Sequence, residues 1–426
     1  MKTRNKNLRV ILSAVSVLLV LVTVVMSSFS FTASADDEPE VKGKVTQTIK
    51  KTKDNTALLQ SMLDTTPYYI VVRHKHMGGS HYAYTDALAE TNGSDDRYKE
   101  YNFYPGSSMV LLTAVDKGET VEIYEYQLLQ SNAGVIRDPD VSNDGKKVLF
   151  SYKKSTTDDF HIYEMDIATK ELTQLTFGSG KSDIEPKYLP NGKIVFNSNR
   201  CVQTVDCWIT PVQNLYIMDA DGKNAIRVGY DQVHTTYPTV TSDGRVLYTR
   251  WDYNDRTQMW VQGVFQMFQD GSNQTELYGN NSNFPTTLLH TREIPGSAGK
   301  YISIVSGHHV YQQGKVVLVD TNKGRNDKDS IKYLTRDGNK FGTPSNIDGG
   351  SYTTDGAVYK YPYAISETEF FVAALHRPQF IQHRSAPKTK IAYFCYCNSF
   401  PGKSKDSIPV GILLFNTIFQ QLHTHL

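Results

Sequence analysis

The sequence contains few cysteines, almost no net charge, and none of the common hydrolase motifs. Four cysteines in 426 residues are too few for a fold that depends on a disulfide framework. The 45 Lys and Arg residues nearly balance the 44 Asp and Glu residues, so the chain lacks the basic field that nucleic-acid binding requires. A Gly-x-Ser-x-Gly nucleophile motif, a phosphate loop and a His-Glu-x-x-His zinc motif are all missing. Hydrolase and nucleotide-binding functions therefore have no support from motifs.

The N-terminus has the features of a secretory signal. Four Lys or Arg residues within the first nine positions precede an apolar run over residues 10–26, and Ala-Ser-Ala follows at 33–35. This order predicts a signal peptide over residues 1–35, cleaved before Asp36, and a periplasmic or secreted protein. The alternative is an uncleaved anchor, since the run approaches the roughly 20 residues that span a bilayer.

The composition favours β-structure. The chain has 27 Tyr, 18 Phe and 29 Gly residues. Aromatic side chains suit the pleated surface of a sheet, and glycine suits the tight turns between strands. We therefore expect an all-β fold.

Two alternating patterns recur along the chain. The first is a proline, a turn with Asp-Gly or Asn-Gly, and an apolar strand, as in residues 139–150 (PDVSNDGKKVLF). Its prolines are Pro139, Pro186, Pro238 and Pro285, with a weaker copy at Pro362. The second is a strand that ends in Asp, as in residues 161–166 (HIYEMD) and 316–320 (VVLVD). A repeat of about 50 residues with several strands predicts the blades of a β-propeller, about six in number.

The repeats define the expected domain boundaries. Residues 36–66 are charged and predict a linker with one helical turn, residues 67–372 predict the propeller, and residues 373–426 form an atypical tail without either pattern. The tail leaves open whether the ring is complete at its C-terminus. For closure we expect the first ordered strand, with Ile70 and Val71, to pair in the same blade as residues 370–372.

These repeats resemble a known family. The turn and the following strand are similar to the repeat of TolB-type periplasmic propellers. Residues 73–82, 137–140, 199–208, 231–234, 249–255 and 306–309 together resemble proteins related to the hydrazine synthase alpha subunit, in its propeller-like middle domain. The resemblance covers residues 67–372 and implies a TolB-like propeller. One function that it implies is a metal-dependent oxidoreductase, or an accessory subunit of a hydrazine synthase-like complex.

The resemblance does not extend to haem chemistry. Covalent haem attachment needs Cys-x-x-Cys-His, because two thioethers fix the porphyrin and the histidine ligates iron. The cysteine pairs here are Cys201 with Cys207 and Cys395 with Cys397, and neither has the required spacing or histidine. We expect no haem, and the sequence leaves a transition metal open as a cofactor without establishing one.

Charged residues near the start of each repeat form a candidate ligand site. Innermost strands of a propeller lie along its central channel, so equivalent positions converge on one mouth. The candidates on these segments are Arg137, Asp138, Asp183, Glu185 and His234. Arg250 and Asp252 could add charge-assisted hydrogen bonds to a ligand. The alternative is that these side chains form ion pairs between blades.

Histidines and cysteines give two further candidate sites. His74 and His76 alternate on a predicted strand, and His81 follows a glycine-rich turn, so the three could bind zinc, copper or iron. The alternative is that they line the channel entrance. Cys201 and Cys207 enclose five residues in an exported protein, which predicts a local disulfide, with a thiolate metal site as the alternative.

The sequence supports two functional hypotheses. The first is an exported, non-catalytic propeller that binds a partner protein or small ligand at its central mouth. The second is the metal-dependent oxidoreductase or accessory subunit that the resemblance implies. Metal content separates them.

Overall fold

The computed structural model describes most of the chain from Gly43 to Leu375, together with two later strands. The described residues are 43–53, 56–65, 68–74, 105–205, 211–253, 262–282, 285–307, 314–335, 358–375, 390–396 and 412–413. The predicted signal peptide, His76, His81, Cys207 and Cys397 lie outside these residues. Within the described part of the chain, no helix is long and apolar enough to cross a membrane.

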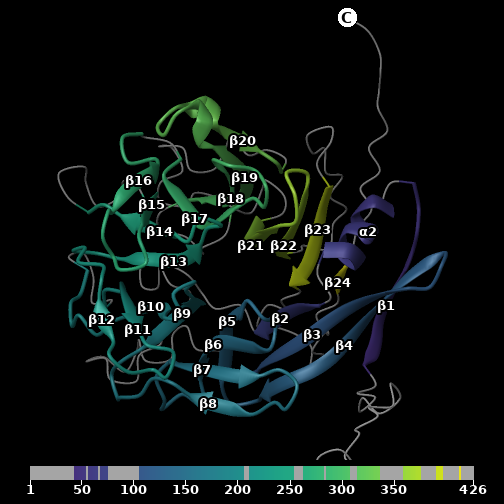
Figure 1. Cartoon of the computed structure of the whole chain (residues 1–426), viewed down its shortest axis with the longest axis horizontal. Helices are drawn as coiled ribbons and strands as arrows, with labels where there is room; N and C mark the ends of the chain where they lie inside the picture. Colours follow the sequence, from purple (N-terminus) through teal and green to yellow (C-terminus); the bar gives the residue numbers. More distant parts are fainter. Residues whose placement is uncertain are drawn as a thin grey trace, which may run out of the picture. The chain divides into compact units, whose positions relative to one another are not determined.

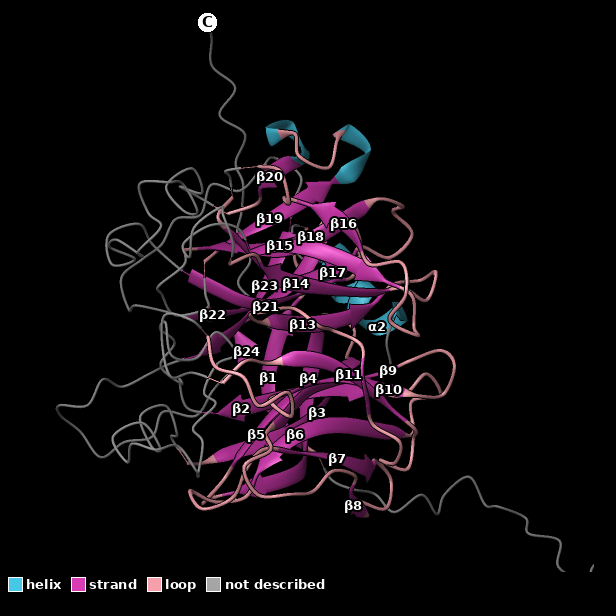
Figure 2. Ribbon diagram, turned by 90° about the vertical axis from the view of Figure 1, so that its left-hand side faces the viewer, coloured by secondary structure: helices cyan, strands magenta, loops and turns pink. Residues whose placement is uncertain are grey.

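The described residues form six four-stranded groups, which we number as blades 1 to 6. Four sheets have four strands each, and a fifth has eight because blades 4 and 5 join through one parallel pairing of Gln262 with Thr287. The all-β prediction and the prediction of a propeller with about six blades are confirmed. Figure 2 shows strands almost throughout, with helix only at α2 and two short turns.

Blades 1 to 3 comprise the first twelve of the described strands. Blade 1 consists of β1 (Lys44–Lys50), β2 (Tyr69–His74), β3 (Ser107–Asp116) and β4 (Thr120–Ser131), in the order β2-β3-β4-β1, and α2 spans Thr56–Thr65. Blade 2 consists of β5 (Val135–Val141), β6 (Lys147–Lys153), β7 (His161–Asp166) and β8 (Leu172–Gln174). Blade 3 consists of β9 (Asp183–Tyr188), β10 (Ile194–Ser198), β11 (Asn214–Met218) and β12 (Ile226–Arg227).

Blades 4 to 6 follow in the same order. Blade 4 consists of β13 (Thr235–Val240), β14 (Val246–Trp251), β15 (Gln262–Met267) and β16 (Thr275–Tyr278). Blade 5 consists of β17 (Thr287–Glu293), β18 (Lys300–Ser306), β19 (Lys315–Asp320) and β20 (Ile331–Tyr333), with 3-10 turns η1 (Thr321–Lys323) and η2 (Lys328–Ser330). Blade 6 consists of β21 (Val358–Ala364), β22 (Glu369–Leu375), β23 (Lys390–Tyr396) and β24 (Ile412–Leu413).

The blades extend beyond the boundaries that the repeats indicate. β1 and α2 lie inside the predicted linker, and β1 pairs with β4 as the outermost strand of blade 1. β23 and β24 lie inside the predicted tail, where β23 runs parallel to β22. Neither segment carries the proline-turn pattern, because each supplies an outer strand without a complete hairpin of its own.

Each pair of neighbouring blades shares its own hydrophobic cluster. Alternate side chains of a strand point to opposite faces, so Val148 and Phe150 of β6 face blade 1 while Leu149 faces blade 3. Four further clusters join the other neighbours around the ring. Figure 1 shows β5, β9, β13, β17 and β21 innermost, with β8, β12, β16 and β20 on the outside.

The ring closes by packing, and not by the strand pairing that we expected. β2 pairs with β3, whereas β22 pairs with β21 and β23, so the two segments lie in different blades. They nevertheless lie side by side, because the Phe371 ring meets the Tyr69 ring edge-on with centroids 5.1 Å apart. Ile49, Leu59 and Met62 join the same cluster. The N-terminal β1 and α2 add apolar surface at this junction. The ring can therefore close without a blade that combines strands from both ends of the chain.

Candidate functional site

The inner strands of blades 2 to 6 share a β-bulge that places one residue near the centre of the ring. Each strand has a register shift against its hairpin partner. The residue at the shift adopts a left-handed conformation: Asp138, Glu185, Tyr237, His290 and Tyr361, with φ between 49° and 57°. This conformation costs a non-glycine residue roughly 1–2 kcal/mol. Five strained residues at equivalent positions require compensating contacts.

Those contacts run from each blade to the next. The Asp138 carboxylate accepts the backbone N–H of Glu185 at 3.3 Å, and the Glu185 carboxylate accepts the N–H of Tyr237 at 2.7 Å. The Tyr237 and His290 rings then lie 4.0 Å apart, and the His290 and Tyr361 rings lie 4.4 Å apart. These five residues, which we call the inner ring, connect blades 2 to 6 in series.

The positions of the inner-ring residues show that one of the predicted repeat prolines was assigned wrongly. Proline follows the left-handed residue at positions 139, 186, 238 and 362, as the repeat predicts. In blade 5 the corresponding residue is Thr291, which follows His290. The anchor predicted at Pro285 is wrong: this proline precedes β17 and lies outside its bulge. Blade 5 has Thr291 where the other blades have the repeat proline, so the spacing of Pro285 from Pro238 matched the repeat only by coincidence.

Three of the predicted ligand-site residues meet at the inner ring: its members Asp138 and Glu185, and the neighbouring Arg137. Arg137 is 1% exposed and donates from Nε to Asp138 at 2.6 Å. Its Nη2 lies 3.8 Å from Glu185 Oε1, and its guanidinium lies over the Phe160 ring, 5.8 Å from the centroid. The expected convergence of Arg137, Asp138 and Glu185 is therefore present, at the junction of blades 2 and 3.

Glu185 has the strongest electrostatic perturbation in this cluster. This residue is 3% exposed, and burial raises the pKa of its carboxyl to about 7, with a further increase from the charge of Asp138 and an opposing decrease from Arg137. Asn197 Nδ2 and the Tyr237 N–H both donate to Oε2. The carboxyl group can therefore gain or lose a proton near neutral pH.

The other four predicted residues form separate contacts. Asp183 is fully buried and receives two hydrogen bonds from Arg200, at 2.9 and 2.7 Å. Arg250 Nε lies 2.9 Å from Asp231 and 3.1 Å from Asp252. The structure thus divides the predicted site into three ion-pair groups.

His234 lies beside Trp251 and not in the inner ring. Its Nδ1 accepts the backbone N–H of Gln213 at 3.1 Å, and its ring is stacked on Trp251 with centroids 6.0 Å apart. Because Nδ1 accepts, a neutral His234 carries its proton on Nε2. A role of His234 in ligand binding stays a prediction.

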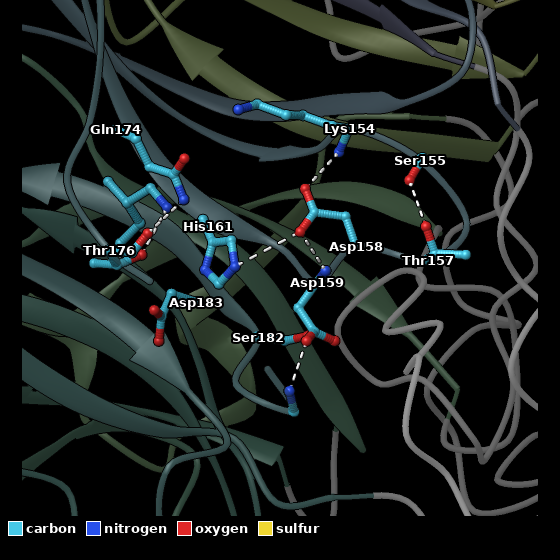
Figure 3. A network of polar contacts seen from close by, with 12 residues as sticks. Lys154, Ser155, Thr157, Asp158, Asp159, His161, Gln174, Thr176, Ser182 and Asp183 are labelled. Carbon is cyan, nitrogen blue, oxygen red and sulfur yellow. Dashed lines mark hydrogen bonds and ion pairs between the residues drawn. The ribbon is translucent and has the colours of Figure 1, made fainter. Parts of the chain in front are cut away.

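A second polar network at the junction of blades 2 and 3 was missed at the sequence level. His161 begins β7, is 5% exposed, and places Nε2 3.8 Å from the Asp158 carboxylate. Figure 3 shows its ring between Asp158 and Asp183. Asp159 accepts the N–H of Gly180 at 2.6 Å, which fixes the connection to blade 3. The signal for this network was the polar first residue of the HIYEMD strand.

The candidate metal and disulfide residues are only partly described. His74 is the last residue of β2, and His76 and His81 lie outside the described residues. Among the residues that the structure describes, no group of three His, Cys, Asp or Glu side chains could hold a metal ion. The histidine site therefore stays a prediction.

The predicted disulfide is not observed at Cys201, and its predicted partner Cys207 lies outside the described residues. Cys201 is a free thiol, and its Sγ donates to the carbonyl of Val212 at 3.3 Å. It also packs against the apolar cluster of Val205, Val212, Val233 and Trp251. Burial raises the pKa of this thiol. A half-buried cysteine that packs as a small apolar residue has a structural role without a disulfide.

Comparison with known proteins agrees with this architecture. Over 155 residues the chain is 30% identical to the Tol-Pal system protein TolB of Francisella tularensis, a match that covers 36% of this chain and 32% of the relative. The fold is that of a TolB-like β-propeller. No family model matches the chain. The chain spans about a third of the length of these TolB relatives.

A solved structure is similar over a longer part of this TolB-like propeller. Hydrazine synthase of Kuenenia stuttgartiensis superposes with a TM-score of 0.53 at 16% identity, covering 74% of this chain and 43% of that chain. TolB from Acinetobacter baumannii gives a TM-score of 0.31 at 16% identity, over 50% of this chain and 49% of that one. The resemblance to hydrazine synthase is confirmed at the level of the fold, and the resemblance to TolB is confirmed by the match over 155 residues.

Proposed function

We propose that this TolB-like propeller is an exported protein that binds a partner protein or small ligand at one mouth of its ring, without haem chemistry of its own. The observation that carries the proposal is a set of exposed apolar side chains at one end of blade 3. Val202, Tyr230 and Phe177 are 91%, 73% and 63% exposed. Exposed apolar groups beside a polar cluster are typical of binding surfaces.

The strand register supports a common location for these side chains. Asp183, Ser198 and Asn214 are aligned across β9, β10 and β11, so they mark one end of blade 3. The connections that carry Phe177, Val202 and Tyr230 all adjoin this end, since they lead into β9, out of β10 and out of β12. The Asp183–Arg200 ion pair lies at the same end. A partner bound here would meet apolar groups next to charged ones.

Site-specific photocrosslinking tests this proposal. A photoreactive amino acid replaces Tyr230 in one variant and Asn191 in a matched control, whose exposed hairpin lies at the opposite end of blade 3. In the periplasmic fraction of the source cell, we expect a discrete crosslinked species from position 230 and none from 191. Equal crosslinking at both positions, or none at either, would contradict binding at this mouth.

The partner class and the location follow from the same relatives. The TolB relative is named as a Tol-Pal system protein, so components of such a system are the first proteins to identify in a crosslinked band by mass spectrometry. Export predicts a mature N-terminus at Asp36 in the periplasmic fraction. Recovery of the full-length chain from membranes alone would support an anchor.

Metal-dependent oxidoreductase activity is the second proposal, and it rests on His74, His76 and His81 together with the hydrazine synthase-like fold. Imidazole groups suit zinc, copper and iron. Plasma mass spectrometry of the purified mature protein would support this activity by finding one transition metal per chain, lost in H74A. A protein without stoichiometric metal would rule out that form of the proposal.

A further inference from the structure

Two buried oxygen atoms, one in the inner ring and one beside it, receive no hydrogen bond from any residue that the structure describes. Glu185 is 3% exposed and Asn197 is fully buried. Asn197 Nδ2 donates to Glu185 Oε2, which also accepts the backbone N–H of Tyr237. Glu185 Oε1 and Asn197 Oδ1 receive no hydrogen bond within the described part of the chain. Buried acceptors without donors are rare in folded proteins and costly.

These two oxygens belong to planar groups that already share one hydrogen bond. A carboxylic acid and a carboxamide can form a cyclic pair, in which the amide N–H donates to one oxygen and the acid O–H donates to the amide oxygen. A single proton on Glu185 Oε1 would therefore give both oxygens a partner. We propose that Glu185 is a proton-binding site, whose O–H donates to Asn197 Oδ1 in the folded protein.

The surrounding charges favour the protonated form. From β5, Arg137 and Asp138 face Glu185, and they are paired with each other at 2.6 Å, so the guanidinium is already partly neutralised. On β9 itself, Asp183 is paired with Arg200 at 2.7 Å and Lys187 with Asp140 at 3.2 Å. Ser151, Asn197 and Tyr237 contact Glu185 through uncharged groups, and the Ser151 hydroxyl accepts the Glu185 N–H at 3.0 Å. On β7, which also packs against β9, Glu164 accepts the Tyr188 hydroxyl at 2.9 Å and is paired with Lys147 at 2.6 Å, and His161 Nε2 lies 3.8 Å from Asp158. The raised pKa of Glu185, to about 7, agrees with this arrangement.

Protonation of Glu185 would change the net charge of the cluster that it forms with Arg137 and Asp138. With Glu185 neutral, Arg137 and Asp138 balance each other; with Glu185 ionised, the cluster carries one uncompensated negative charge. Because Glu185 connects blade 2 to blade 4 through its backbone and side-chain hydrogen bonds, this change acts on the contacts between three blades. The proposal concerns folding and ionisation, so its test is independent of whether a partner binds the mouth.

The test is chemical denaturation of the mature protein at several pH values between 5 and 9. The folded-state pKa of Glu185 is raised above its ordinary value, so its contribution to stability is full at low pH and is lost as the pH rises to about 7. In E185Q the amide Nε2–H replaces the acid O–H and can donate to Asn197. We expect E185Q to lack this pH dependence and to be at least as stable as the wild type at pH 8.

Asp183→Asn is the matched control, because Asp183 is also a buried acid of β9 but has an ion-pair partner. It should lose stability across the whole range while keeping the wild-type pH dependence. Infrared difference spectra of the wild type between pH 6 and pH 9 should show loss of the carbonyl band of a carboxylic acid, absent in E185Q. A wild type without this band, or E185Q with the wild-type pH dependence, would overturn the proposal; the first result would instead indicate a water molecule donating to both oxygens.

Discussion

Phe371 should hold the first and last blades together. Its side chain is 2% exposed in β22, and it packs against Val71, Val110 and Leu112 of blade 1. No hydrogen-bonded strand pair between β2 and β22 supports this junction among the described residues. Truncation of a buried phenylalanine to alanine costs about 3–5 kcal/mol, from the lost transfer energy and the cavity. We therefore expect F371A to reduce the free energy of unfolding by about 4 kcal/mol, measured by guanidinium denaturation.

The neighbouring residue gives a control of equal size. Phe370 is fully buried on the same strand, but its side chain belongs to the cluster between blades 5 and 6. F370A should cost a similar amount, so the location of the damage is the informative measurement. Hydrogen exchange should speed up in β2 and α2 for F371A, and in β17 and β18 for F370A. If F371A costs less than about 1 kcal/mol, or leaves exchange in β2 and α2 unchanged, closure by this cluster is wrong.

Three further predictions test individual contacts. R200M should lower the free energy of unfolding by about 3 kcal/mol, because it leaves the Asp183 carboxylate buried without its partner; a loss below 1 kcal/mol in denaturant would contradict the assignment. Cys201 should react slowly with a thiol reagent at neutral pH and rapidly after unfolding, since burial raises its pKa; rapid labelling of the folded protein would contradict this burial. Gly222→Ala should lower the melting temperature clearly more than Gly192→Ala. Both glycines have φ above 80°, but a Cβ at 222 would lie 2.1 Å from a carbonyl oxygen of blade 2, whereas a Cβ at 192 would meet no atom within 4 Å. Equal losses of melting temperature would refute the steric argument.

The repeat pattern predicted the blades because each hairpin depends on local residues. A turn with Asp-Gly or Asn-Gly needs glycine at positive φ, and Gly145, Gly192 and Gly244 have φ of 72° to 81°. The apolar strand after the turn must fill both faces of a blade. These requirements act within about ten residues, so one sequence reveals them.

Ring closure could not be predicted in the same way. β1 pairs with β4 across 70 or more residues of sequence, and Phe371 meets Tyr69 across the whole propeller. Apolar residues in α2 and β1 have no distinctive spacing that identifies this role. The repeat pattern therefore could not predict this long-range packing, and the expected pairing of the first and last strands within one blade was wrong.

The candidate site was predicted in part for a related reason. Arg137, Asp138 and Glu185 precede or adjoin repeat prolines, so equivalence between blades was enough to place them together. Asn197 was missed because it lies on the second strand, where a single buried amide has no recurring signal. Its partner atoms become apparent only when the hydrogen bonds of Glu185 are counted in the structure.

The chemistry of the inner ring changes along the chain, and charge balance explains the change. Blades 2 and 3 place carboxylates at the bulge, and blades 4 to 6 place Tyr237, His290 and Tyr361 there. Carboxylates at all five positions would repel one another in a buried environment, where one guanidinium, that of Arg137, faces the two acids. Rings can instead make the contacts from one blade to the next without adding a carboxylate. The polar half of the inner ring is thus limited to the blades that Arg137 reaches, which places the charged part of the candidate site between blades 2 and 3.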